Sequence, residues 1–147
     1  MRQSALADSG PLAALFNSRD SYHVQCAAFF KARGSALVLH TTWEVISEVM
    51  YFLDFSAATQ SEFLEWLSAG HARGLLHIAA LTPEDLTGLA ALIRKYSDRP
   101  MDLADASLVW LANRTGISDI ITLDRADFSV HRTAKRKAFR NLMAVRP

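Results

Sequence analysis

"MDLADASLVWLANRTGISDIITLDRADF", residues 101–128, reads as an amphipathic helix, a turn and a buried strand, and this order decides the fold class. The helix begins with two carboxylates, Asp102 and Asp105, and the strand runs directly into a third, Asp124. One aspartate at a helix start is explained by capping of the free backbone N–H groups. Three carboxylates within 23 positions, among mostly apolar residues, indicate a further role.

The bulk composition is that of an ordinary globular protein. Half of the 147 residues are hydrophobic and 21% are charged, which excludes an intrinsically disordered chain. The length predicts a single domain, residues 1–147. Cys26 is the only cysteine, so no internal disulfide can form and a reducing cytoplasm is the predicted location. No apolar run has the length of a membrane span or a signal peptide, so we expect no membrane association.

The charge is unevenly distributed along the chain. Residues 131–147 contain six basic residues and no acidic ones, whereas residues 1–130 contain 10 basic and 15 acidic residues, a net charge of −5. An acidic body with a basic tail suits a phosphate-rich partner, with metal ions between acids and phosphates. A solvated final helix explains the tail nearly as well. The tentative RNA-binding residues are Arg132, Lys135, Arg136, Lys137 and Arg140.

Short apolar segments of strand length alternate with segments of helical periodicity. The predicted strands are 4–7, 36–40, 75–81 and 119–123, with a last strand around 139–145. The predicted helices are one opening near Ser9 and Pro11, then 21–34, 41–55, 56–74 and 82–98, the helix of the opening stretch, and a segment in the tail. This alternation predicts one α/β domain with a parallel sheet covered by helices on both sides.

Two of the carboxylates follow predicted strands directly: Asp8 comes after 4–7 and Asp124 after 119–123. Ligands of open parallel sheets bind at the carboxyl ends of the strands, so both side chains are predicted at the same rim. Glu48 shares a helix face with Glu44, one turn earlier, and Asp102 shares one with Asp105. Carboxylates gathered in this way repel one another unless cations neutralise them.

Hard carboxylate oxygens suit Mg²⁺ or Mn²⁺, which lower the pKa of a bound water and bridge to phosphate oxygens. The sequence contains no zinc-like His/Cys spacing, no GxxxxGK[ST] loop and no GxSxG motif. The five histidines are scattered and form no ligand motif. The residues therefore favour metal-assisted hydrolysis of a phosphodiester.

Four blocks, "ADSGPLAALFN", "TTWEVISEVMYFL", "PMDLADASLVWLA" and "IITLDRADF", resemble in order the acidic blocks of PIN-domain ribonucleases, particularly VapC-type toxins. The resemblance covers nearly the whole chain. It implies a three-layer α/β/α sandwich and a Mg²⁺- or Mn²⁺-dependent endoribonuclease. It also implies a homodimer inhibited by a small antitoxin protein. The motif "DSG" departs from the family pattern, in which many members have Thr or Ser followed by a small apolar residue.

The resemblance assigns the candidate site residue by residue. The residues implied to be catalytic and metal-binding are Asp8, Glu48, Asp105 and Asp124, with Asp102 as an additional metal ligand. Ser9 and Thr122 are implied as supporting hydroxyls near the metal. Structural readings stand beside these: Asp8 and Asp102 also suit helix caps, and Thr122 suits an ordinary strand threonine.

Other polar and aromatic residues are interpreted structurally. Glu44 is predicted to be a surface or first-turn residue, and Asp127 a turn former. Trp43, Trp66 and Trp110 are predicted to pack in the core or in a dimer contact rather than to stack on bases.

Two rival functions remain open. One is a non-catalytic PIN-like module that binds RNA or a protein partner. The other is a phosphatase with Asp8 as nucleophile, although Gly10 stands where that chemistry usually places a second aspartate.

Overall fold

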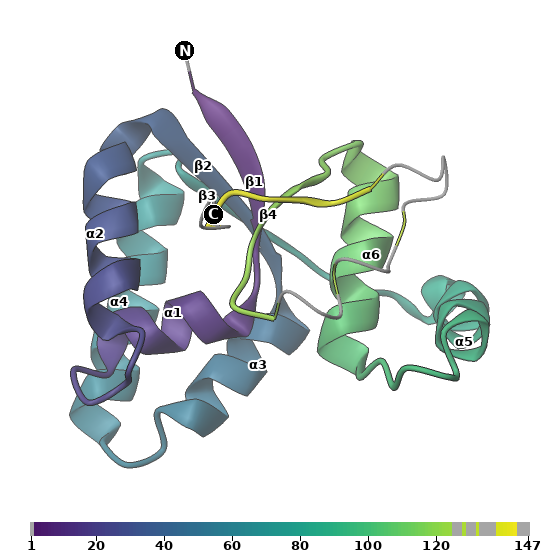
Figure 1. Cartoon of the computed structure of the whole chain (residues 1–147), viewed down its shortest axis with the longest axis horizontal. Helices are drawn as coiled ribbons and strands as arrows, with labels where there is room; N and C mark the ends of the chain where they lie inside the picture. The colour runs from purple at the N-terminus through teal and green to yellow at the C-terminus, as the bar shows by residue number, and fades with distance from the viewer. Residues whose placement is uncertain (1, 125–127, 129–131, 133–137, 144–147) are drawn as a thin grey trace.

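The computed structural model describes residues 2–124, 128, 132 and 138–143. Within these residues five parallel strands form a sheet in the order β3-β2-β1-β4-β5 (Figure 1). The strands are β1 (Gln3–Ala7), β2 (Leu37–Thr42), β3 (Leu76–Ala79), β4 (Asp119–Ile121) and β5 (Arg140–Asn141). The predicted parallel sheet is confirmed.

Helices cover both faces of this sheet. They are α1 (Ser9–Phe16), α2 (His23–Arg33), α3 (Trp43–Phe52), α4 (Ala57–Ala72), α5 (Leu86–Lys95) and α6 (Leu103–Thr115), with short 3₁₀ turns η1 (Gly34–Ala36) and η2 (Pro83–Asp85). Figure 1 shows α1, α2 and α4 on one side of the sheet and α5 and α6 on the other. The predicted three-layer α/β/α sandwich is confirmed. No helix in the described ranges is long and apolar enough to cross a membrane.

The central strands are buried from both sides, which is why they are apolar on both faces. Ala5, Leu6 and Ala7 of β1 and Ile120 and Ile121 of β4 are each at most 1% exposed. Such continuous apolar runs are typical of parallel strands between two helix layers. The chain order reverses between β1 and β4, because β2 and β3 lie on one side of β1 whereas β4 and β5 lie on the other. Open α/β sheets bind ligands at such a switch point.

Several element ends differ from the predictions for identifiable reasons. β2 continues to Thr42, because Thr41 and Thr42 pair with Ile78 and Ala79 of β3. β4 ends at Ile121 rather than at residue 123. At Thr122, the side chain of Asn141 takes the place of the backbone hydrogen bonds between strands. Its Oδ1 accepts from the Thr122 N–H at 3.4 Å, and its Nδ2 donates to the Thr122 carbonyl at 3.0 Å.

The helix predicted over 82–98 is shorter than expected. Its start forms the turn η2, in which Thr82 and Asp85 make a reciprocal capping box, and α5 then ends at Lys95. Within the described part of the predicted last strand, residues 139–143, the strand is Arg140–Asn141. The predicted tail helix falls largely outside the described residues.

Of the three tryptophans predicted to pack in the core or in a dimer contact, Trp66 and Trp110 lie in the core and Trp43 does not. Trp66 and Trp110 pack against core clusters, whereas the Trp43 side chain is 52% exposed. Trp43 is the first residue of α3, and the buried stripe of that helix is formed by Val45, Ile46 and Val49. The helical period identifies a stripe but does not fix which residues form its boundary.

Leu6 offers a direct test of the fold, because it lies fully buried in the central strand. We predict that Leu6→Ala lowers the free energy of unfolding by roughly 2–5 kcal/mol, from lost burial and the cavity left behind. Leu64→Ala is the matched control, since Leu64 on α4 is 42% exposed, and its effect should stay within about 0.5 kcal/mol. Urea unfolding followed by circular dichroism measures both. Equal losses in the two variants would contradict this placement of the core.

Candidate active site

The site lies where β1 and β4 end. Ala7 pairs with Ile121 in the sheet, and the Asp8 N–H donates to the Ile121 carbonyl at 3.0 Å. Because the two parallel strands end in register, the residues that follow them, Asp8 and Thr122, start from the same edge. This edge is the carboxyl end at which the sequence predicts the site.

Hydrogen bonds hold the Asp8 carboxylate at both oxygens. Its Oδ1 accepts from the Ser9 N–H at 2.8 Å, which makes Asp8 the N-cap of α1. Its Oδ2 accepts from the Thr122 hydroxyl at 2.7 Å, and the Thr122 Oγ1 in turn accepts from the Asp124 N–H at 2.9 Å. Asp8 is only 6% exposed and Thr122 1%. Thr122 therefore ties the end of β4 to the acid that follows β1.

Helix α3 brings Glu48 to the same place. The Ser9 hydroxyl donates to Glu48 Oε1, which joins the start of α1 to the middle of α3. Glu48 is half-buried, and its neighbours Val49 and Val45 lie in the core. Ser9 is thus a positioning hydroxyl for Glu48, while the cap of α1 is supplied by Asp8.

The last two acids come from the first turn of α6. Asp102 is the N-cap of this helix, and its Oδ1 accepts from the Asp105 N–H at 2.8 Å. A buried hydroxyl pair, Thr42 with Ser107 at 2.7 Å between oxygens, fixes the same end of α6 against β2. Asp102 is exposed and Asp105 half-buried. The capping role of Asp102, one of its two predicted readings, is therefore present.

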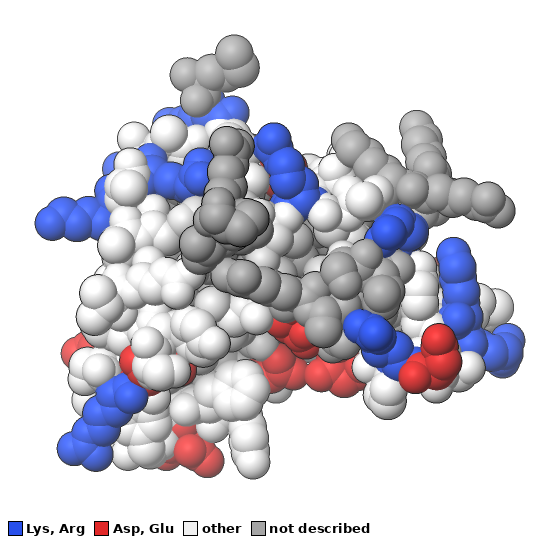
Figure 2. All heavy atoms as spheres, viewed as in Figure 1, with Lys and Arg blue, Asp and Glu red and all other residues white. Residues whose placement is uncertain are grey.

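Electrostatic interactions connect all five acids through Asp8. Burial raises the pKa of Asp8 above its ordinary value, and the charges of Asp124 and Asp102 raise it further, against the lowering effect of its hydrogen bonds. Burial likewise raises the pKa of Glu48, with further contributions from Asp102 and Asp8. Burial, Asp102 and Asp8, in that order, raise the pKa of Asp105 to about 8. Figure 2 shows acidic side chains gathered between the helix layers, at the lower middle of the view.

This donor set fits a hard divalent cation in its chemistry and charge. The acids are oxygen donors whose mutual repulsion a cation would relieve. In the described part of the chain, however, no three His, Cys, Asp or Glu side chains are already arranged as a metal-binding group. The oxygens of Asp8 and one oxygen of Glu48 are engaged by hydroxyl and N–H donors instead. Cation binding therefore requires side-chain adjustment within a site whose backbone frame is set.

Comparisons with known proteins agree with this fold. No protein-family model matches the chain. Over 127 residues the chain is 27% identical to Ribonuclease VapC26 of Mycobacterium tuberculosis, covering 86% of this chain and 91% of that protein. The structure matches that of Mycobacterium tuberculosis VapC20, a toxin that cleaves the sarcin–ricin loop, with a TM-score of 0.69 and 16% identity, covering 84% of this chain and 92% of that one.

In sequence the chain is similar to a VapC ribonuclease, and it shares the fold of a VapC toxin. The sequence resemblance to this family is thereby confirmed.

The structure describes two of the five tail residues that are predicted to bind RNA, Arg132 and Arg140. Arg140 forms a two-pronged ion pair with Asp119, at 2.8 and 2.9 Å, beside the start of β4. The acids lie beyond the opposite end of that strand. The Arg132 backbone N–H donates to the Tyr96 hydroxyl after α5. Lys135, Arg136 and Lys137 lie outside the described residues, so a role of the tail in RNA binding stays a prediction.

Two residues beside the acids, Trp43 and Glu44, are not among the predicted site residues. Glu44, predicted to be a surface or first-turn residue, is in the first turn of α3 but has one carboxylate oxygen, Oε1, buried without a hydrogen-bond partner in the described structure. Trp43 lies next to it at the surface. The sequence feature that could have placed Glu44 near the site is its spacing, because Glu44 stands one helical turn before Glu48.

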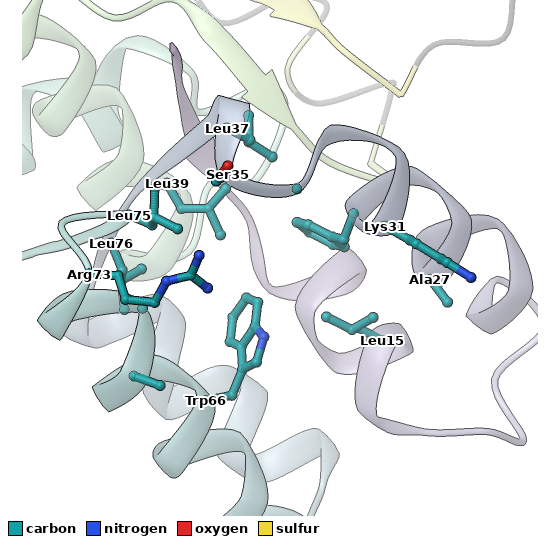
Figure 3. A pocket seen from close by; sticks show the side chains of 14 residues that line it. Leu15, Ala27, Lys31, Ser35, Leu37, Leu39, Trp66, Arg73, Leu75 and Leu76 are labelled. Carbon is teal, nitrogen blue, oxygen red and sulfur yellow. The ribbon is translucent and has the colours of Figure 1, made fainter.

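A hollow separate from the acidic site lies in the layer of α1, α2 and α4. It has a volume of about 540 Å³ and is lined mainly by apolar side chains of α1, α2, α4 and the strands beside them. Figure 3 shows Leu15 and Trp66 facing this hollow, with Lys31 from α2 and Arg73 after α4 on opposite sides. Because it has no carboxylate in its lining, this hollow does not resemble the acidic site.

The raised carboxyl pKa values predict how stability depends on pH when divalent cations are removed with EDTA. A carboxyl whose pKa is higher in the folded state binds more protons folded than unfolded, so its contribution to stability falls as pH rises between the two values. For Asp105 these are the ordinary 3.8 and about 8. We predict that Asp105→Asn becomes more stable relative to the wild type as pH rises from about 5 to about 8.

Chemical unfolding of both proteins across this range measures the difference. The comparison cancels the opposing contribution of His40, whose pKa is lowered by burial and by His77, and which is present in both proteins. A stability difference that does not change with pH would show that the pKa of Asp105 is not raised in the folded protein.

Proposed function

We propose that this VapC-like chain is a divalent-metal-dependent endoribonuclease that hydrolyses RNA phosphodiester bonds, and the toxin of a toxin–antitoxin pair. One observation supports it most strongly: acids from four separate segments meet around Asp8 at the switch point of the sheet. The likeness to Ribonuclease VapC26 and to the sarcin–ricin loop cleaving toxin supports the same activity.

The residues that would hold one or two metal ions are Asp8, Glu48, Asp102, Asp105 and Asp124. A bound Mg²⁺ or Mn²⁺ supplies an activated water and stabilises the charge of the phosphodiester transition state. Among the supporting residues, Thr122 orients Asp8 and Asp124 together, because it bonds to both. Ser9 orients Glu48. A carboxylate of the site that orients the attacking water is sufficient, and no side chain is assigned as a general base.

The partners follow from the remaining surfaces. We assign an antitoxin segment with apolar side chains and acidic neighbours to the hollow of Figure 3, because its walls are apolar and Lys31 and Arg73 lie on opposite sides. We assign a homodimer contact to α5, where Leu86 is 63% and Ile93 41% exposed, two turns apart on one helix face. The basic tail is assigned to RNA phosphates. The reducing cytoplasm fits the buried free thiol of Cys26.

A non-catalytic module is the second candidate, and one observation favours it. The acids are not preassembled as a three-ligand cage within the described chain. In this alternative the acids serve folding, as the caps formed by Asp8 and Asp102 do. The module would bind RNA with no need for a metal and release no products.

Single substitutions separate the two candidates. We predict that Asp8→Asn and Asp105→Asn each reduce Mg²⁺-dependent RNA cleavage by more than about 100-fold, since even the loss of a residue that only orients a ligand costs roughly 10–100-fold. The matched control is Glu65→Gln on α4, which neutralises an exposed acid away from the site and should keep full activity. Cleavage of mixed RNAs, followed by gel electrophoresis, measures all of them.

Removal of the metal tests the same proposal without a substitution. EDTA should stop cleavage by the wild type, and added Mg²⁺ or Mn²⁺ should restore it. Wild-type rates in Asp8→Asn and Asp105→Asn, or cleavage that persists in EDTA, would rule out the proposed metal mechanism. RNA binding without products under every metal condition would establish the non-catalytic module.

A further inference from the structure

One side chain of the last strand, Asn141 of β5, extends the sheet to the edge of the acidic site. Ser118 and Ile120 accept hydrogen bonds from backbone N–H groups of β5 at 2.9 and 2.8 Å. Thr122 is the next position in this alternation, and there the Asn141 side chain supplies both bonds: Nδ2 donates to the Thr122 carbonyl at 3.0 Å, and Oδ1 accepts from the Thr122 N–H at 3.4 Å. A carboxamide carries the same kinds of donor and acceptor as a peptide group, so it continues the sheet by one residue.

The orientation of the Asn141 amide is itself fixed. The Met143 N–H donates to the same Oδ1 at 3.1 Å, which forms the turn in which an asparagine side chain accepts from the backbone two residues further on. Asn141 is half-buried, and its backbone pairs with Ile120 of β4. Three hydrogen bonds therefore hold the amide, and two of them go to Thr122.

Thr122 connects Asn141 to the acids. Its hydroxyl donates to Asp8 Oδ2 at 2.7 Å and accepts from the Asp124 N–H at 2.9 Å. A threonine side chain is stiff about its first torsion angle because it is branched at Cβ. The direction of the hydroxyl therefore follows the Thr122 backbone, and the Asn141 amide holds that backbone at both its N–H and its carbonyl.

We propose that Asn141 is a positioning residue of the metal site, which acts through Thr122 to hold Asp8 and Asp124 where together they can bind a divalent cation. The inference rests on the proposed function, since it assumes that the acids bind a metal. It gives β5 a part in the site although none of its residues is an acid. Residues that orient metal ligands typically contribute 10–100-fold to metal affinity.

Mn²⁺ titrations by isothermal titration calorimetry measure this contribution in the full-length protein, without reference to cleavage. Asn141→Leu removes the amide and keeps a side chain of similar size, and we expect it to weaken Mn²⁺ binding about tenfold. Thr122→Val removes the hydroxyl and keeps the branched shape, and should weaken binding at least as much. The double variant should bind no more weakly than Thr122→Val alone, because both changes then interrupt one path.

Gln3→Leu is the matched control. It also replaces an amide by an apolar side chain, but Gln3 donates to Asp119 at the start of β4, at the opposite end of the strand from the acids. It should keep the Mn²⁺ affinity of the wild type. Urea unfolding of each variant shows whether a change in affinity is separate from a loss of stability, since a merely structural role of Asn141 would lower stability alone.

An unchanged Mn²⁺ affinity in Asn141→Leu would overturn the inference, and so would losses that multiply in the double variant or a wild type that binds no Mn²⁺. Should Asn141→Leu not fold, Asn141→Ser, with its shorter polar side chain, is judged by the same criteria. The outcomes also separate this inference from the proposed function. The expected affinities in a protein that cleaves no RNA contradict only the nuclease, and metal-dependent cleavage with an unchanged affinity in Asn141→Leu contradicts only the role of Asn141.

Discussion

Burial of carboxylates, together with the repulsion between them, is the constraint on which the rest of this structure depends. Asp8 lies at the end of the central strand, almost removed from water. The charges of Asp124 and Asp102 raise its pKa. The charge of Asp8 in turn raises the pKa of Glu48 and of Asp105. Such an arrangement opposes folding unless protons or cations reduce the negative charge. A protein that needed only a stable α/β core would gain by replacing these acids. Their presence at the switch point is therefore best explained by the ligand they select.

Hydroxyl and N–H donors stabilise the ionised form of the site carboxylates and so oppose these effects. Thr122 and the Ser9 N–H each satisfy one oxygen of Asp8, the Ser9 hydroxyl satisfies Glu48, and the Asp105 N–H satisfies Asp102. These donors stabilise the ionised carboxylates and fix the positions of their side chains. Each hydrogen-bonded oxygen keeps a second lone pair, so the same oxygens can also bind a cation.

The position of the acids could be predicted from the sequence because parallel topology determines it. Residues that follow adjacent parallel strands share an edge, so Asp8 and the residues after β4, from Thr122 to Asp124, start from the same edge once β1 and β4 are paired. The individual contacts could not be predicted. The bond from Ser9 to Glu48 depends on how α1 packs on α3, and the end of β4 at Ile121 depends on a side chain of β5, Asn141. Periodicity could not show that Trp43 lies outside the apolar stripe or that Glu44 has a buried oxygen.

The central claim is that acids distant in the sequence together trap a cation at the carboxyl end of β1. Crystals of the wild-type protein soaked in Mn²⁺ test it most directly, because the anomalous scattering of manganese locates the ion without reference to activity. The account predicts an anomalous peak within coordination distance of an Asp8 oxygen, about 2.0–2.3 Å, with Asp105 or Asp124 among the other ligands. Saturating Mn²⁺ that leaves this position empty, or that binds only at acids elsewhere on the surface, would contradict it.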